Sequence, residues 1–90
     1  MEYDFESKAL SFLRELHDLA HGNPRSIVVG KEIARRVGIR YTIEDYNPVA
    51  RRLRDSGLIE EPGTTGLHLF SITPAGMQVV REGRLPLFLT

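Results

Sequence analysis

Two pairs of a helix-capping residue followed by proline, Asn47-Pro48 and Thr73-Pro74, constrain the fold of this chain most. Side chains of asparagine and threonine accept hydrogen bonds from the free N–H groups at a helix start, and proline is favoured at the first helical position. Glycine is favoured just after a helix end. The two pairs, with Gly57 and Gly83, therefore predict helices over 48–56 and 74–82.

A competing start precedes the first of these helices. Thr42 and Asp45 have the spacing of a capping box. A helix that began at Thr42 would enclose Pro48, at a cost of about 3 kcal/mol. We therefore expect a separate helical turn at 42–46 and the helix proper at 48–56.

The residues between the two proline-initiated helices have the pattern of a β-hairpin. Leu58-Ile59-Glu60 begins a strand, 61–66 has the composition of a loop, and Leu67 to Ile72 alternates as a returning strand. We therefore expect a hairpin over 58–72. A short β-branched run bounded by Pro24 and Gly30 predicts a further edge strand at 26–29.

Apolar periodicity predicts two more helices. One stripe runs over 5–21, with Asp4 as its N-cap and Gly22 at its end; its members are Phe5, Ala9, Phe12, Leu13, Leu16 and Leu19 or Ala20. The second helix covers 31–37 and is followed by Gly38, a glycine cap, and by Ile39, its usual hydrophobic contact.

Composition limits the class of protein. Ninety residues with 41% hydrophobic content make one domain over 1–90, since a chain of this size closes a single core. The N-terminal MEYDFESKAL has acids where a secretory signal carries lysines, no apolar run is long enough to span a membrane, and cysteine is absent. We expect a cytoplasmic protein without membrane partners, disulfides or cofactors.

Charge is balanced over the chain, with 12 basic and 12 acidic residues, but it is unevenly distributed. Residues 31–54 contain seven lysines and arginines against three acids. A basic segment of this kind is compatible with nucleic-acid binding, and it is equally the pattern of a solvated helix face.

The order helix, strand, helix, helix, hairpin, helix is the layout of a winged helix-turn-helix. VARRLRDSGLIEE at 49–61 resembles the recognition helix and first wing strand of bacterial regulators of the MarR, ArsR and PadR kinds, and FSITPAGMQVV at 70–80 resembles the step that closes the wing. The resemblance implies an α+β, mainly α fold: a three-helix core, a two-stranded wing with a short third strand, and a C-terminal helix.

The same resemblance implies that the helix at 48–56 enters the major groove of double-stranded DNA. By position, the candidate base readers are Asn47, Arg51 and Arg52, because amide and guanidinium groups match purine edges. The candidate phosphate contacts are Lys31, Arg35, Arg40 and Thr42. Glu44 and Asp45 would repel phosphate unless they cap the helix or pair with Arg40 or Arg51.

The apolar tail at 84–90 is unusual for a free terminus. A small winged helix that reads a palindromic site must dimerise, usually through an arm outside its core. The candidate dimer contacts are Leu85, Leu87, Phe88 and Leu89. The tail packing on its own first helix is an equal alternative.

No catalytic constellation is present, so we do not expect an enzyme. His17 and His21 have the spacing of the HExxH zinc motif, with Asp18 in the glutamate position, but the remaining histidine, His68, lies in the expected hairpin, so we expect no metal site. The leading interpretation is a dimeric DNA-binding transcription regulator. The alternative is a winged-helix module that binds another protein.

Overall fold

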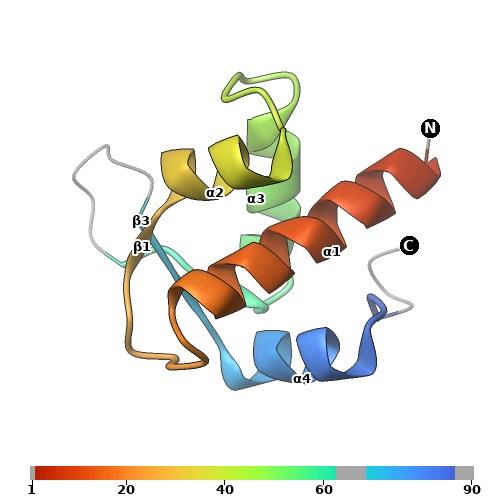
Figure 1. Cartoon of the computed structure of the whole chain (residues 1–90). Helices are drawn as coiled ribbons and strands as arrows, with labels where there is room; N and C mark the ends of the chain where they lie inside the picture. Colours follow the sequence, from red (N-terminus) through yellow and green to blue (C-terminus); the bar gives the residue numbers. More distant parts are fainter. Residues whose placement is uncertain (1, 63–68, 87–90) are drawn as a thin grey trace.

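The structure is a computed structural model that describes residues 2–62 and 69–86. Within these ranges the elements are α1 (Glu2–Leu19), β1 (Val28–Val29), α2 (Gly30–Val37), α3 (Tyr46–Asp55), β2 (Ile59–Glu60), β3 (Leu69–Ile72) and α4 (Pro74–Glu82) (Figure 1). The chain is therefore an α+β domain, mainly helical, as the sequence predicts. None of the helices in the described part of the chain is long and apolar enough to cross a membrane.

The three strands form one antiparallel sheet in the order β1-β3-β2. Val28 pairs with Phe70, and Ile59 pairs with Ile72. The central strand is therefore β3, and β1 and β2 are the two edges. The link of the expected hairpin, at 63–68, lies outside the described residues.

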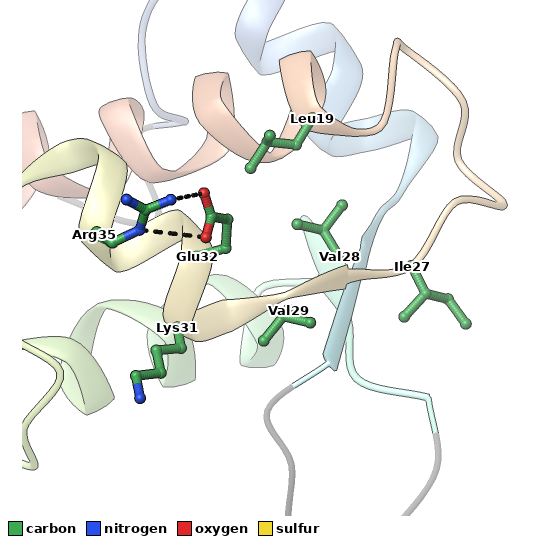
Figure 2. Close-up of a pocket in the computed structure, with 7 residues that line it drawn as sticks. All are labelled: Leu19, Ile27, Val28, Val29, Lys31, Glu32 and Arg35. Atoms are coloured by element: carbon green, nitrogen blue, oxygen red, sulfur yellow. Dashed lines mark hydrogen bonds and ion pairs between the residues drawn. The ribbon is translucent and has the colours of Figure 1, made fainter.

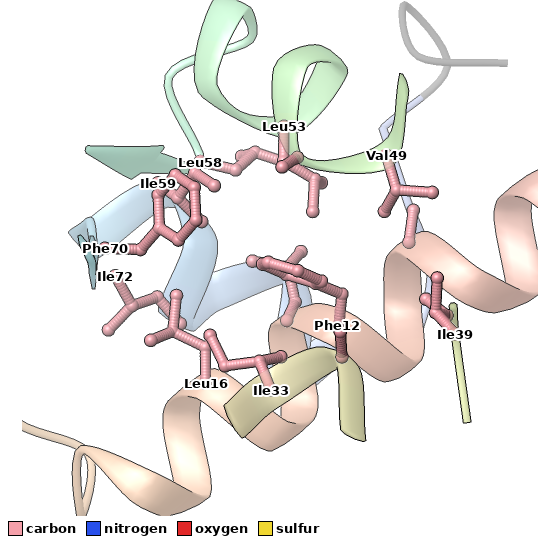
Figure 3. Packing of buried hydrophobic residues seen from close by; sticks show 14 of the residues in the cluster. Phe12, Leu16, Ile33, Ile39, Val49, Leu53, Leu58, Ile59, Phe70 and Ile72 are labelled. Carbon is pink, nitrogen blue, oxygen red and sulfur yellow. The ribbon is translucent and has the colours of Figure 1, made fainter. Parts of the chain in front are cut away.

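The core is built around α1, which packs against α2, α3, α4 and β3. The side chains of Phe12 and Leu16 on α1 are fully buried (Figure 3). Leu13 on the same helix is also fully buried. The ring of Phe12 lies 5.9 Å from the ring of Tyr46 in α3 and 5.9 Å, edge to face, from that of Phe70 in β3. Full burial of such side chains contributes about 1.5–3 kcal/mol each.

The first helix is shifted toward the N-terminus relative to the expected 5–21. Asp4 lies within α1 and is not its N-cap. At the other end the left-handed backbone begins at His21 (φ 54°), one residue before Gly22 (φ 69°). The N–H of Gly22 donates to the carbonyl of His17 at 2.9 Å, and this turn ends α1 at Leu19.

The third helix begins at Tyr46, two residues earlier than expected, so Asn47 is not its N-cap. The carbonyl of Thr42 accepts from the N–H groups of both Tyr46 (3.0 Å) and Asn47 (3.2 Å), so the turn after Thr42 runs directly into α3. Pro48 is then the third residue of α3. Proline is tolerated there because the first N–H groups of a helix have no partner within it.

Helices α2 and α3 end in the same way. Gly38 and Gly57 take left-handed conformations (φ 77° and 78°). The next residue then donates its N–H back into the helix, Ile39 to Ala34 at 3.0 Å and Leu58 to Leu53 at 3.1 Å. Each reversal buries the apolar residue that follows the glycine.

Helix α4 has the bounds expected from its sequence. The Thr73 hydroxyl accepts from the N–H of Gly76 at 3.1 Å, and it donates to the carbonyl of Gly57 at 2.6 Å. Gly76 is buried against the chain that leaves α3. A Cβ there would overlap the backbone carbonyl of Leu58 and come within 2.9 Å of the Ile72 side chain.

Substituting Gly76→Ala tests this close approach. Helix propensity alone predicts a gain of about 1 kcal/mol, whereas overlap with backbone costs about 1–3 kcal/mol or more. We expect a net loss of about 2 kcal/mol in the free energy of unfolding, measured by urea denaturation. The matched control, Ala75→Gly at the exposed neighbouring position, measures the propensity term alone. A stabilised Gly76→Ala variant would contradict the packing of α4 on Leu58.

Candidate nucleic-acid interface

Helix α3 has one buried face and two exposed flanks. Tyr46, Val49, Ala50 and Leu53 face the core. At 100° per residue, Asn47, Arg51 and Arg54 fall on one flank and Arg52 on the other. The burial of α3 therefore separates Arg51 from Arg52, which the sequence had placed in one reading set.

The flank with Asn47 and Arg51 borders a small polar cleft between α3 and the sheet. The cleft has a volume of about 210 Å³ and is lined by Asn47, Ala50, Arg51, Arg54, Glu61 and Phe70. Arg51 is exposed and forms no ion pair with any described residue. Its guanidinium and the Asn47 amide are thus presented together beside the end of β2.

Arg54 and Glu61 also belong to this cleft, although neither is among the residues predicted from the sequence. Nη1 of Arg54 donates to Oε1 of Glu61 at 2.8 Å, and the pKa of Arg54 is raised mainly by this hydrogen bond. Arg54 follows Arg51 by three residues and Asn47 by seven, so helical periodicity was the available signal. Its pairing with Glu61 across the bend after α3 had no such signal.

Arg52 is placed differently from the prediction. Its guanidinium carbon lies 4.8 Å from the centre of the Phe5 ring in α1. A cation over an aromatic face at an exposed site contributes about 0.5–1 kcal/mol. Arg52 therefore joins α3 to α1, and the structure does not place it with the other candidate base readers.

Most arginines of the basic segment are paired with carboxylates of the same chain. Arg35 pairs with Glu32, and Arg36 contacts both Glu32 (3.3 Å) and Glu15 (3.6 Å). Arg40 pairs with Asp45, which is one of the arrangements that would relieve repulsion between Asp45 and phosphate. The local excess of positive charge is thus largely compensated at the surface.

The predicted phosphate contacts lie in two places, on α2 and in the turn between α2 and α3. Lys31 and Arg35 are exposed on α2, and Lys31 forms no ion pair within the described ranges. Arg40 and Thr42 lie in the turn ahead of α3, where the Thr42 hydroxyl accepts from the N–H of Asp45 at 3.1 Å. Thr42 therefore acts as a local cap, as the capping-box spacing predicts.

The expected dimer contacts separate into two groups. Leu85 is only 6% exposed and belongs to the chain's own hydrophobic core, which agrees for this residue with the alternative of packing on its own domain. The residue follows α4 after the glycine turn at Gly83, which directs it inward. Leu87, Phe88 and Leu89 lie outside the described residues.

The two histidines of the HExxH-like spacing do not share a helix face. His17 lies in α1 and contacts the carboxylate of Asp18 at 3.5 Å. His21 lies beyond the helix, in the left-handed turn. Within residues 2–62 and 69–86 no three histidine, cysteine or acidic side chains gather as metal ligands.

Comparison of the chain with protein-family models, with curated proteins and with solved structures gave no significant match.

The ion pair between Glu32 and Arg35 is testable by titration. The hydrogen bond from Arg35 holds the pKa of the Glu32 carboxyl below its ordinary value of 4.5, and Arg36 lowers it further. We expect Arg35→Gln to raise that pKa more than Arg36→Gln does, in an NMR titration of the carboxyl carbon. Because a lowered pKa stabilises the fold above the unfolded-state pKa, the stability difference between the parent and Arg35→Gln should shrink as pH falls through the folded-state pKa. An unchanged pKa in Arg35→Gln would contradict the pair.

Proposed function

We propose that the chain is a winged helix-turn-helix domain that binds double-stranded DNA through α3 and acts as a transcription regulator. The observation that carries the proposal is the exposed flank of α3, where the Asn47 amide and the Arg51 guanidinium lie one helical turn apart beside the sheet. Asparagine pairs bidentately with adenine and arginine with guanine in the major groove. The order of α2, a turn and α3, followed by β2 and β3, supports the same proposal.

Roles follow from position. Asn47 and Arg51 would read bases, and Arg54 would join them once it leaves Glu61. Lys31 and Arg35 on α2, with Arg40 and Thr42 in the turn, would contact phosphate. Arg52 would act through its contact with Phe5, holding α3 against α1.

The carboxylate pairs determine how strongly such binding depends on salt. Each neutralised phosphate contributes about 0.9 to the slope of log affinity against log salt concentration. Among the candidate phosphate contacts, Lys31 is the cation without an ion pair in the described part of the chain. We expect a slope of about −1, because Arg51 would contact bases, and Arg35 and Arg40 must first exchange a carboxylate for a phosphate.

A palindromic DNA site would require two copies of the chain. Half-sites read by a dimeric helix-turn-helix protein are about 34 Å apart, so the two α3 helices would have to face the same side of the duplex. Our candidates for the dimer contact are Leu87, Phe88 and Leu89. Leu85 is not retained as a candidate, because it packs in the core of its own domain.

The direct test is binding of the full chain to mixed and selected duplexes over a salt series. We expect Arg51→Ala to reduce affinity for the preferred site by about 1–3 kcal/mol and to relax its base preference. Arg81→Ala, which removes an exposed arginine from α4, is the matched control and should change little. Fluorescence anisotropy measures both. Absence of binding at low salt, or equal losses in the two variants, would refute the role of α3.

A second candidate function is a winged-helix module that binds a protein. Two observations favour it. Most arginines of the basic segment are paired with carboxylates, and the turn before α3 exposes apolar side chains, with Ile43 78% exposed next to Tyr41. These two residues, with Thr42, Tyr46 and Asn47, line a hollow of about 330 Å³. DNA would then have no specific role.

Glu61→Gln discriminates between the two functions. If α3 binds DNA, release of Arg54 from Glu61 should tighten binding, with only the longer contact of Arg54 to Asp55 (3.6 Å) remaining. Glu60→Gln removes the same charge from the neighbouring exposed residue, which the structure shows in no ion pair among the described residues, and should have the smaller effect. Equal effects of the two variants on DNA affinity would mean that only net charge matters and that Arg54 has no specific role on DNA. That result would favour the protein-binding module.

A further inference from the structure

A groove follows the free edge of β1, on the side of the molecule formed by the end of α1 and the start of α2. It has a volume of about 510 Å³ and is lined by Leu19, Ile27, Val28, Val29, Lys31, Glu32 and Arg35 (Figure 2). The lining is mainly apolar near the strand, and the charged residues come from α2. None of the roles proposed above explains the apolar part.

The edge of β1 has unused backbone hydrogen-bonding capacity. β1 pairs with β3 on one side, through Val28 with Phe70 and Val29 with Leu69, and the described sheet has no strand on its other side. In an antiparallel ladder, successive residues direct their N–H and C=O groups alternately toward the two neighbours. One of Val28 and Val29 therefore directs its backbone groups into the groove.

Side chains flank this edge on both faces of the sheet. Figure 2 shows Val28 directed toward Leu19 of α1, while Ile27 and Val29 point to the opposite side. Ile27 is 56% exposed and Val29 is 50% exposed. An added strand would thus find apolar contacts for its side chains on both faces, which is the arrangement used in strand addition.

The charge at the end of the groove is positive. Lys31 is exposed and forms no ion pair with the described residues, whereas Glu32 is already engaged by Arg35 and Arg36. Helix α2 begins beside it, and its N-cap, Val29, provides no side-chain hydrogen bond to the first turn. The positive end of the helix dipole reinforces the preference for an acidic group.

We propose that the free edge of β1 binds an extended, apolar polypeptide segment of another protein as an added strand, with an aspartate or glutamate of that segment facing Lys31. A second copy of this chain fits less well. Antiparallel pairing of two copies about Val28 would set Ile27 against Val29, but the residues that precede Ile27 (Asn23, Pro24, Arg25 and Ser26) include no acid that could face Lys31 of the other copy.

The test is a selection of random eight-residue peptides on the full chain, with sequencing of the binders and measurement of their affinities. We expect enrichment of peptides that alternate valine, isoleucine or threonine with other residues and carry one acid near an end. Methylation of backbone nitrogens along one edge of a selected peptide should abolish binding. Methylation along the other edge should not, because only one edge of an added strand pairs with β1.

Matched variants locate the site. Ile27→Ser should weaken a selected peptide about tenfold, since one partly exposed isoleucine contributes about 1.4 kcal/mol. Ala75→Ser, at an exposed apolar residue of α4 that does not line the groove, should leave the affinity unchanged. Lys31→Glu should weaken acidic peptides and strengthen versions in which lysine replaces the acid.

Four outcomes would overturn the proposal: no enrichment, enrichment of basic peptides, equal losses in Ile27→Ser and Ala75→Ser, or insensitivity to methylation on both edges. Circular dichroism of each variant verifies that it is folded. The proposal is independent of DNA binding except at Lys31 and Arg35, which line the groove and are also proposed phosphate contacts. If the selection yields no peptide and Lys31→Glu loses affinity for DNA, the result would instead assign this surface to contact with the DNA backbone.

Discussion

The contact of Phe12 with the rings of Tyr46 and Phe70 is the interaction on which the rest of the structure depends. It joins α1, α3 and β3 at one point in the core, each ring pair being 5.9 Å apart. Once Tyr46 is held there, helical geometry directs Val49, Ala50 and Leu53 inward and leaves Asn47 and Arg51 at the surface beside the sheet. The exposed flank of α3 is therefore a consequence of aromatic packing several residues earlier.

The surface chemistry is governed by competition between internal and external partners for arginine. Exposed ion pairs contribute little to stability, typically 0–1 kcal/mol. They nevertheless occupy the guanidinium groups of Arg35, Arg40 and Arg54, so that an anionic ligand meets a surface already compensated by Glu32, Asp45 and Glu61. Selectivity at such a surface comes from geometry more than from net attraction, which is consistent with equal numbers of acidic and basic residues in the chain.

Several features set by neighbouring residues were predictable from the sequence, whereas features set by tertiary contacts were not. Thr73-Pro74 and Gly83 gave the bounds of α4 because capping and left-handed glycine are local effects. The start of α3 predicted from Asn47-Pro48 was wrong. The Thr42 carbonyl accepts two N–H groups, and α3 therefore begins before the proline. The positions of Arg52 over Phe5 and Arg54 beside Glu61 depend on how α3 lies against α1 and β2, which periodicity does not specify.

The two edge strands also limit how this sheet can associate. β1 has two residues and leads directly into α2 at Gly30, and β2 has two residues and is followed within two positions by Pro62, which has no N–H to donate. Long, flat, unprotected edges template fibril growth, and short edges that end in a helix or near a proline do not. The shortness of both edge strands thus disfavours aggregation of the folded chain through its sheet.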